Sequence, residues 1–87
     1  MNIKVSASPN PFSSQLSVEI RSDGYANAVI RLMGEKDTLV RIAGCSTEEG
    51  FAQIVIGNLG RYAPGDYRLE IRSLSGELME SLSLVKN

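Results

Sequence analysis

The chain contains no histidine, no tryptophan and a single cysteine, Cys45, among its 87 residues. One cysteine cannot form an internal disulfide, so the chain is not a disulfide-stapled scaffold. Cys45 is expected to be a small buried hydrophobe or an inert surface thiol. A cysteine nucleophile would lack its usual histidine base, and a zinc site would lack most of its usual ligands. We therefore expect no metal, no cofactor and no catalytic residue.

Charge of one sign and long apolar runs are also scarce. Nine Lys and Arg residues against ten Asp and Glu residues give a net charge of −1, with no basic run. Nucleic acid is therefore not an expected partner. No apolar stretch approaches the ~20 residues that cross a bilayer, so we expect no membrane insertion. No signal peptide opens the chain, so it is expected to be a fragment of a larger secreted protein if it is exported.

The polar motifs do not form a catalytic pattern. "GEKD" (34–37) and "TEEG" (47–50) lack the spacing of a calcium loop, and "GNLG" (57–60) is not followed by a helix, as a phosphate-binding glycine loop would be. The other acidic residues mostly fall on polar strand faces or in turns. A carbohydrate platform would need aromatic residues on one strand face, and the five aromatic residues are dispersed. The sequence predicts a protein that is not an enzyme.

Seven stretches alternate between apolar and polar residues, which is typical of half-buried β-strands. No helical periodicity lasts for two turns. The chain length allows one domain over residues 1–87. The sequence therefore predicts an all-β, immunoglobulin-like antiparallel β-sandwich of about seven strands. The stretches are residues 3–5, 16–21, 28–32, 40–42, 51–56, 67–72 and 78–84.

Turn motifs separate these stretches. "SDGY" (22–25) predicts a hairpin, and "LSGE" (74–77) predicts a tight turn with Gly76 at the demanding position. "APGDY" (63–67) predicts a turn that leads into the strand of Tyr67. We expect the Tyr67 ring to point inward and its hydroxyl group to bond to a loop.

The opening motif "SPNPF" (8–12) places two prolines around an asparagine. Pro9 and Pro11 have fixed φ angles and no N–H group, so this segment cannot be a central strand. It is expected to be a rigid crossover in which Asn10 can bond its own backbone and Phe12 plugs one end of the sandwich. A corner that only sets the chain direction is one sufficient interpretation.

Three segments together resemble the C-terminal sorting domain of type IX secretion substrates: "SPNPF" (8–12), "IRLMGEKDTLV" (30–40) and "PGDYRLEIRSLSGELMESLSLVKN" (64–87). They occur in the same order and at similar separations as in that family. The middle motif departs from the family pattern at Met33, Gly34, Asp37 and Thr38, and Glu77 replaces a basic residue. The positions that match the family motifs are Pro9, Asn10, Pro11, Phe12, Pro64, Gly65, Tyr67, Gly76, Leu84, Val85 and Lys86.

The resemblance implies a non-catalytic signal at the C-terminus of a secreted protein. Its partners would be an upstream cargo domain, the type IX translocon and a sortase-like peptidase that removes the domain. The cargo would pass through the periplasm of a Gram-negative bacterium, cross the outer membrane, and be linked to surface lipopolysaccharide or released. The alternative is a structural or adhesive immunoglobulin-like module, a spacer or a carbohydrate-binding module, that is retained on the mature protein.

Two expectations concern the chain end. The last strand is expected to offer an unpaired edge for strand addition by the translocon or for a dimer with a second copy. Lys86 is expected either to place its charge beside the terminal carboxylate or to be a solvated tail residue.

Overall fold

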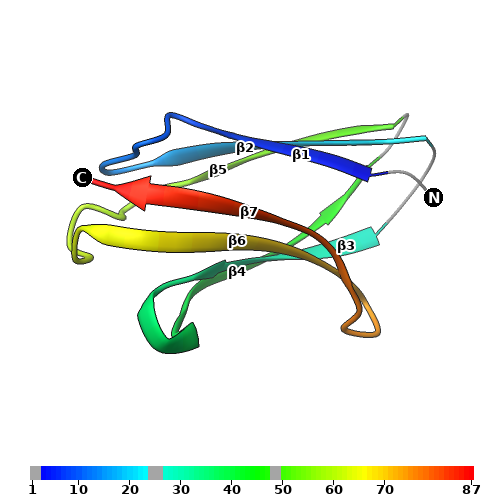
Figure 1. The fold of residues 1–87 in the computed structure, drawn as a ribbon. Helices are drawn as coiled ribbons and strands as arrows, with labels where there is room; N and C mark the ends of the chain where they lie inside the picture. The colour runs from blue at the N-terminus through cyan, green and yellow to red at the C-terminus, as the bar shows by residue number, and fades with distance from the viewer. Residues whose placement is uncertain (1–2, 24–26, 48–49) are drawn as a thin grey trace.

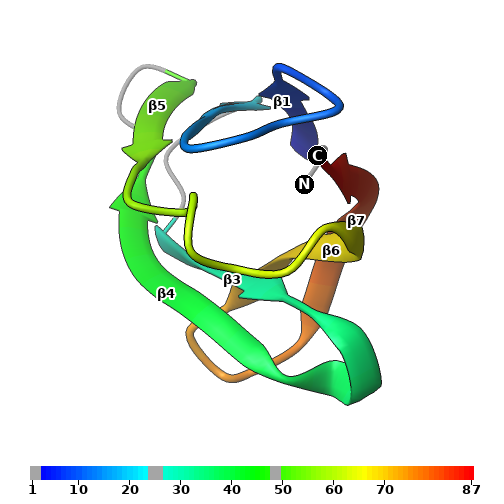
Figure 2. The same cartoon turned by 90° about the vertical axis from the view of Figure 1, so that its left-hand side faces the viewer.

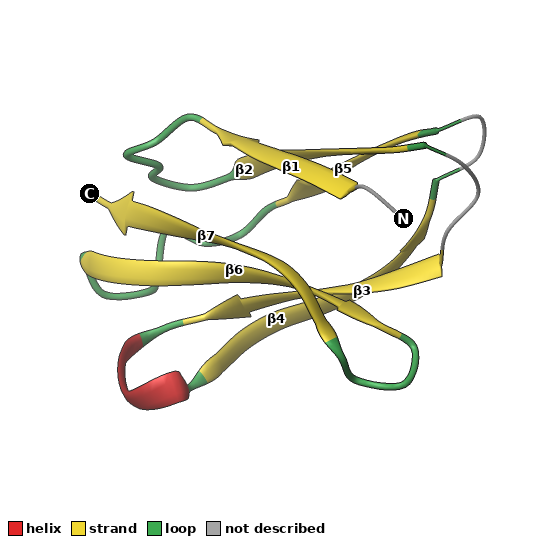
Figure 3. Cartoon of the chain, turned by 45° about the vertical axis from the view of Figure 1, so that its right-hand side comes forward, coloured by secondary structure: helices red, strands yellow, loops and turns green. Residues whose placement is uncertain are grey.

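The computed structural model describes residues 3–23, 27–47 and 50–87. All seven predicted stretches are strands, and a short 3-10 helix, η1 (Glu35–Asp37), joins the third strand to the fourth (Figures 1 and 3). The strands are β1 (Ile3–Ser8), β2 (Leu16–Ser22), β3 (Asn27–Met33), β4 (Leu39–Ser46), β5 (Phe51–Ile56), β6 (Gly65–Ser73) and β7 (Leu78–Lys86).

The strands form two antiparallel sheets that face each other. One sheet has the order β1-β2-β5 and the other has the order β4-β3-β6-β7. The two layers are visible in Figure 1, and Figure 2 looks along the strands from one end of the sandwich. The predicted immunoglobulin-like sandwich is therefore confirmed.

The core lies between the sheets because alternate residues of the central strands point inward. Leu16, Val18 and Ile20 of β2 are at most 1% exposed, and Leu69 and Ile71 of β6 are completely buried. Each such side chain contributes about 1.5–3 kcal/mol on burial. Two residues outside the named strands, Phe12 and Leu59, complete the core.

One predicted turn is confirmed and one predicted hairpin is wrong. In the β6–β7 hairpin, the Ser73 N–H donates to Glu77 O at 2.8 Å and Gly76 has φ +94°, a conformation that favours glycine. β2 and β3, in contrast, belong to different sheets, so the connection through "SDGY" is not a hairpin. Residues 24–26 of that connection lie outside the described residues. An Asp-Gly pair favours a tight turn, but β2 pairs with β1 and β5 in one sheet, whereas β3 lies in the other sheet.

Two further observations concern the sequence expectations. No helix in the described part of the chain is long and apolar enough to cross a membrane. Cys45 is a free thiol that packs against the core from β4, and burial raises its pKa. A raised pKa keeps the thiol protonated and unreactive at neutral pH.

Candidate functional site

The structure brings ten of the eleven predicted site residues together at one end of the sandwich. We call residues 9–13, 63–67 and 84–87 the junction. The C-terminus lies beside the loop that follows β1 (Figures 1 and 2). Gly76 lies at the other end, because Gly65 pairs with Lys86 near the junction while Gly76 is in the hairpin at the far end of β6 and β7. The length of these nine-residue strands separates Gly76 from the junction by about 25 Å.

Backbone hydrogen bonds join the opening motif to the outer edge of β7. The Phe12 N–H donates to Val85 O at 2.9 Å, and the Asn87 N–H donates to Phe12 O at 2.9 Å. This is a parallel bridge between Phe12 and Lys86. The opening motif thus adds one short parallel segment to the four-stranded sheet.

Side chains extend this connection. Asn10 Oδ1 accepts a hydrogen bond from the Val85 N–H at 3.0 Å, and Asn87 Nδ2 donates to Ser13 Oγ at 3.2 Å. Asn10 therefore binds a residue at the other end of the chain, where the sequence had indicated a bond to its own backbone. Ser13 and Asn87 were missed by the sequence prediction, since no local pattern distinguishes them from other exposed polar residues.

Two aromatic residues fix the inner side of the junction. Phe12 is 1% exposed and meets Tyr67 edge to face, with ring centroids 5.6 Å apart. The Tyr67 hydroxyl donates to Ala63 O at 2.6 Å. The predicted plug at Phe12 and the predicted inward ring of Tyr67 with its loop bond are therefore confirmed. Burial raises the pKa of Tyr67, and the nearby Glu35 carboxylate and Tyr62 add to this effect.

The prolines lie on the outer side of the junction. Pro9, Pro11 and Pro64 are exposed, and the peptide bonds before Pro9 and Pro11 are both cis, which the sequence did not predict. Neither Pro9 nor Pro11 lies in a named strand. This agrees with their lack of an N–H donor. The expected crossover is wrong, because β1 and β2 are neighbouring antiparallel strands of one sheet and Ser8 pairs with Ser17. The segment is the loop of this hairpin, and its Phe12 reaches β7 of the other sheet.

Lys86 is only 5% exposed, so the interpretation as a solvated tail residue is wrong. It follows Leu84 on the inward-facing side of β7, and its ammonium group donates to Asn87 O at 3.1 Å. The aliphatic stem of a lysine can be buried while its charged end reaches a polar partner. Alternation along β7 therefore places Lys86 inward.

The edge of β7 is only partly available for pairing. In an antiparallel ladder, backbone groups of alternate residues face the neighbouring strand or the outside. At Val85, both outward-facing groups are occupied, by Asn10 and Phe12. β1 of the other sheet also runs beside β7 (Figure 1). The predicted open edge is therefore closed at the chain end, which confines any added strand or second copy to the part of β7 before Val85.

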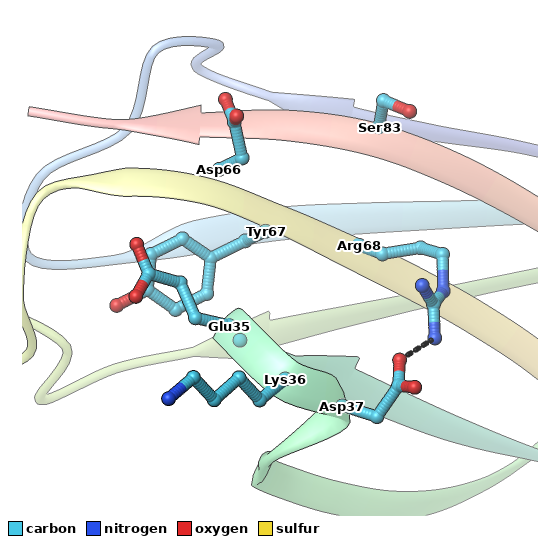
Figure 4. A pocket seen from close by; sticks show the side chains of 8 residues that line it. Glu35, Lys36, Asp37, Asp66, Tyr67, Arg68 and Ser83 are labelled. Atoms are coloured by element: carbon cyan, nitrogen blue, oxygen red, sulfur yellow. Dashed lines mark hydrogen bonds and ion pairs between the residues drawn. The ribbon is translucent and has the colours of Figure 1, made fainter.

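A shallow polar hollow of about 510 Å³ adjoins the junction (Figure 4). Tyr67 and Asp66 line it from β6, Ser83 lines it from β7, and η1 closes it on the side of β4. The Arg68 guanidinium donates to Asp37 Oδ1 at 2.8 Å across its rim. Within residues 3–23, 27–47 and 50–87, no three His, Cys, Asp or Glu side chains are placed to hold a metal ion. The junction is thus held together by backbone and side-chain hydrogen bonds and by the contact between Phe12 and Tyr67.

Comparison with known proteins is informative on the fold alone. No protein-family model matches the chain, and no curated protein matches it. Among solved structures, a β-glucosidase mutant from Listeria innocua in complex with laminaribiose is similar, with a TM-score of 0.53 and 13% identity. The match covers 99% of this chain but 16% of the β-glucosidase chain. The chain therefore shares its sandwich fold with a small part of that protein.

Proposed function

We propose that this domain is a non-catalytic C-terminal sorting signal, recognised by the type IX secretion machinery for export across the outer membrane and attachment of its cargo at the cell surface. The observation that supports this most is the junction. The motifs "SPNPF" and "LVK" that resemble the family lie at opposite ends of the sequence, yet they are hydrogen-bonded to each other. The third motif supplies Tyr67, which packs on Phe12.

A signal that serves many cargoes needs a surface that is independent of the cargo. Bonds within the domain hold the junction, so its shape is set before a partner binds, which reduces the entropic cost of recognition. β1 runs from Ile3 to Ser8 toward the junction, so its start at Ile3 lies about 17 Å from the junction end. Cargo joined upstream would thus enter at the far end and leave the junction exposed to the translocon and the peptidase.

The direct test is a reporter fusion. Residues 1–87 are joined behind a fluorescent protein that is delivered to the periplasm of a bacterium with type IX machinery. We expect reporter at the cell surface or in the medium, and we expect none there after removal of residues 84–87. Circular dichroism of both purified fusions controls for folding. A well-folded complete domain that leaves its reporter in the periplasm would refute the proposal.

A retained immunoglobulin-like module, spacer or adhesive, is the second candidate. It is favoured by one observation, that the sandwich is shared with a small part of a β-glucosidase chain, so the fold by itself does not imply secretion. Mass spectrometry of the mature parent protein separates the two. Peptides from residues 1–87 on the mature protein would support the module, and their absence after processing would support the signal. Retardation in polysaccharide gels would identify a carbohydrate-binding module.

A further inference from the structure

A second cluster, formed by Arg41, Arg61 and Tyr62, lies at the same end of the sandwich. Arg41 comes from β4, whereas Arg61 and Tyr62 come from the connection between β5 and β6. Arg41 donates to the Tyr62 hydroxyl at 2.5 Å and Arg61 donates to the same oxygen at 3.4 Å. Each guanidinium carbon lies 5.3 Å from the centre of the Tyr62 ring. Two cations are thus held around one phenol.

Within the part of the chain that the structure describes, this pair of arginines has no countercharge of its own. Across the described residues, the ion pairs involve Arg68 and Arg72, and neither Arg41 nor Arg61 has a carboxylate within 4.0 Å. Hydrogen bonds from Arg61 and Arg41 lower the pKa of Tyr62, because two cations beside a phenol stabilise its charged form. Two neighbouring cations around one acceptor favour the binding of an anion from solution.

The arginines face a hollow with fixed walls. Arg41 also donates to Val40 O at 3.1 Å, to Asn58 O at 3.3 Å and to Gly57 O at 3.5 Å, and these bonds orient its guanidinium. Leu59 is 1% exposed and its N–H donates to Ser14 O at 2.9 Å, so the connection is tied to the opening segment. The hollow has a volume of about 530 Å³, and its lining contains no carboxylate: Ser14, Arg41, Asn58, Gly60 and Arg61.

We propose that Arg41 and Arg61, with the Ser14 hydroxyl, form a binding site for a phosphate group, either free or as the monoester of a sugar-sized molecule. The two guanidinium nitrogens bond one oxygen, so they lie within about 6 Å of each other and both charges act on one anion. The Nη groups of Arg41 already bond Val40 O, Tyr62 Oη, Gly57 O and Asn58 O, so Arg41 contributes its charge and the exposed Arg61 supplies the direct hydrogen bonds to phosphate. Guanidinium groups match phosphate geometry, and a dianion suits two cations better than a carboxylate does. The hollow leaves room for the ester group.

This site differs from the phosphate-binding loop that the sequence analysis excluded. A phosphate-binding loop uses the backbone N–H groups of its glycines in front of a helix. In the proposed site, the side chains of Arg41, Arg61 and Ser14 bind the phosphate, and the glycines of "GNLG" do not. The distance between Arg41 and Arg61 in the sequence explains why no motif indicates them. The inference does not depend on the proposed sorting function.

The test is an NMR titration of the ¹⁵N-labelled domain at constant ionic strength, with chloride as the reference anion. Inorganic phosphate, glucose 6-phosphate and glucose are added separately. We expect saturable shifts at the Ser14 and Gly60 amides and at the arginine side chains with both phosphates and none with glucose. Tighter binding of glucose 6-phosphate would identify an organic monoester, and equal binding would identify free phosphate as sufficient.

Matched variants establish the site. Arg61→Gln removes an exposed guanidinium and is expected to weaken binding about tenfold or more, as the loss of a charged hydrogen bond does. Arg61→Lys, which keeps the charge but not the planar fork, is expected to weaken it less. Arg21→Gln is the control, because Arg21 also stacks on an aromatic ring, 4.9 Å from the centre of Phe51, and is not in the hollow. Shifts that glucose also produces, shifts without saturation, or equal weakening by Arg21→Gln and Arg61→Gln would each overturn the proposal.

Discussion

Replacing Phe12 tests how strongly the opening motif stabilises the fold. Phe12 lies outside the named strands, but it is 1% exposed and packs edge to face on Tyr67. Truncation of a buried phenylalanine to alanine removes its transfer free energy and leaves a cavity, at a cost of about 3–5 kcal/mol. The aromatic contact itself contributes about 0.5–1.5 kcal/mol of that.

This cost is large for so small a domain. At about 0.05–0.15 kcal/mol per residue, the whole chain has a free energy of unfolding of about 4–13 kcal/mol. Phe12→Ala is therefore expected to remove about a quarter or more of it, and Phe12→Leu, which keeps most of the volume, about 1–2 kcal/mol. For a domain of this size, the latter loss lowers the melting temperature by about 4–16 °C.

The assay is urea denaturation followed by circular dichroism, with the same two substitutions at Phe51 as the matched control. Phe51 is 38% exposed on β5, so its truncation is expected to cost about 1 kcal/mol or less. If Phe12→Ala does not fold, Phe12→Leu and Phe51→Leu still permit the comparison. Equal losses at Phe12 and Phe51 would refute the claim that the opening motif is part of the core.

Three further predictions concern stability. Hydrogen bonds from Arg72, and then Arg68, hold the pKa of Glu70 below its usual 4.5. The ionised carboxylate therefore stabilises the fold fully above pH 4.5, and this stabilisation is lost as the pH falls through the pKa of Glu70 in the folded protein. Glu70→Gln is expected to cost about 1–2 kcal/mol at pH 7 in urea denaturation, with the difference from wild type vanishing in acid; an undiminished difference in acid would contradict this. Asn10→Ala loses the bond to the Val85 N–H and is expected to cost about 0.5–1.5 kcal/mol and to speed amide exchange at Val85, and an unchanged exchange rate would contradict that bond. Gly76→Ala places a side chain at φ +94° and is expected to cost about 1 kcal/mol or more, and a neutral or stabilising effect in thermal denaturation would contradict the strained turn.

The strands and the inward residues could be predicted because alternation is a local property. Leu16, Val18 and Ile20 show by their spacing which side of β2 is buried, and the same argument places Tyr67 inward. Alternation does not say which strand lies next to which, so "SDGY" suggested a hairpin where the chain crosses between sheets. A turn motif specifies local backbone geometry and not the partner strand.

The contacts of the junction could not be predicted in the same way. The bond between Asn10 and Val85 joins residues 75 positions apart, and nothing near either residue encodes it. Lys86 is polar but lies on the inward side of β7, where its aliphatic stem is buried. Its residue type suggested a solvated side chain, whereas its position in the alternating strand determines that it is buried. The contact between Arg41 and Tyr62 likewise depends on β4 meeting the connection between β5 and β6 at one end of the sandwich.

The central claim, that the junction is the part of the domain that is recognised for export, is tested by two substitutions in one strand. Val85 and Leu78 are 45% and 48% exposed on β7, but Val85 lies in the junction and Leu78 lies at the far end. Val85→Asp and Leu78→Asp are both expected to leave the melting temperature nearly unchanged, because both positions are exposed. The measurement is the fraction of fluorescent reporter outside the cell. We expect Val85→Asp to retain the reporter in the periplasm while Leu78→Asp exports it as wild type does, and equal export of the two folded variants would contradict the claim.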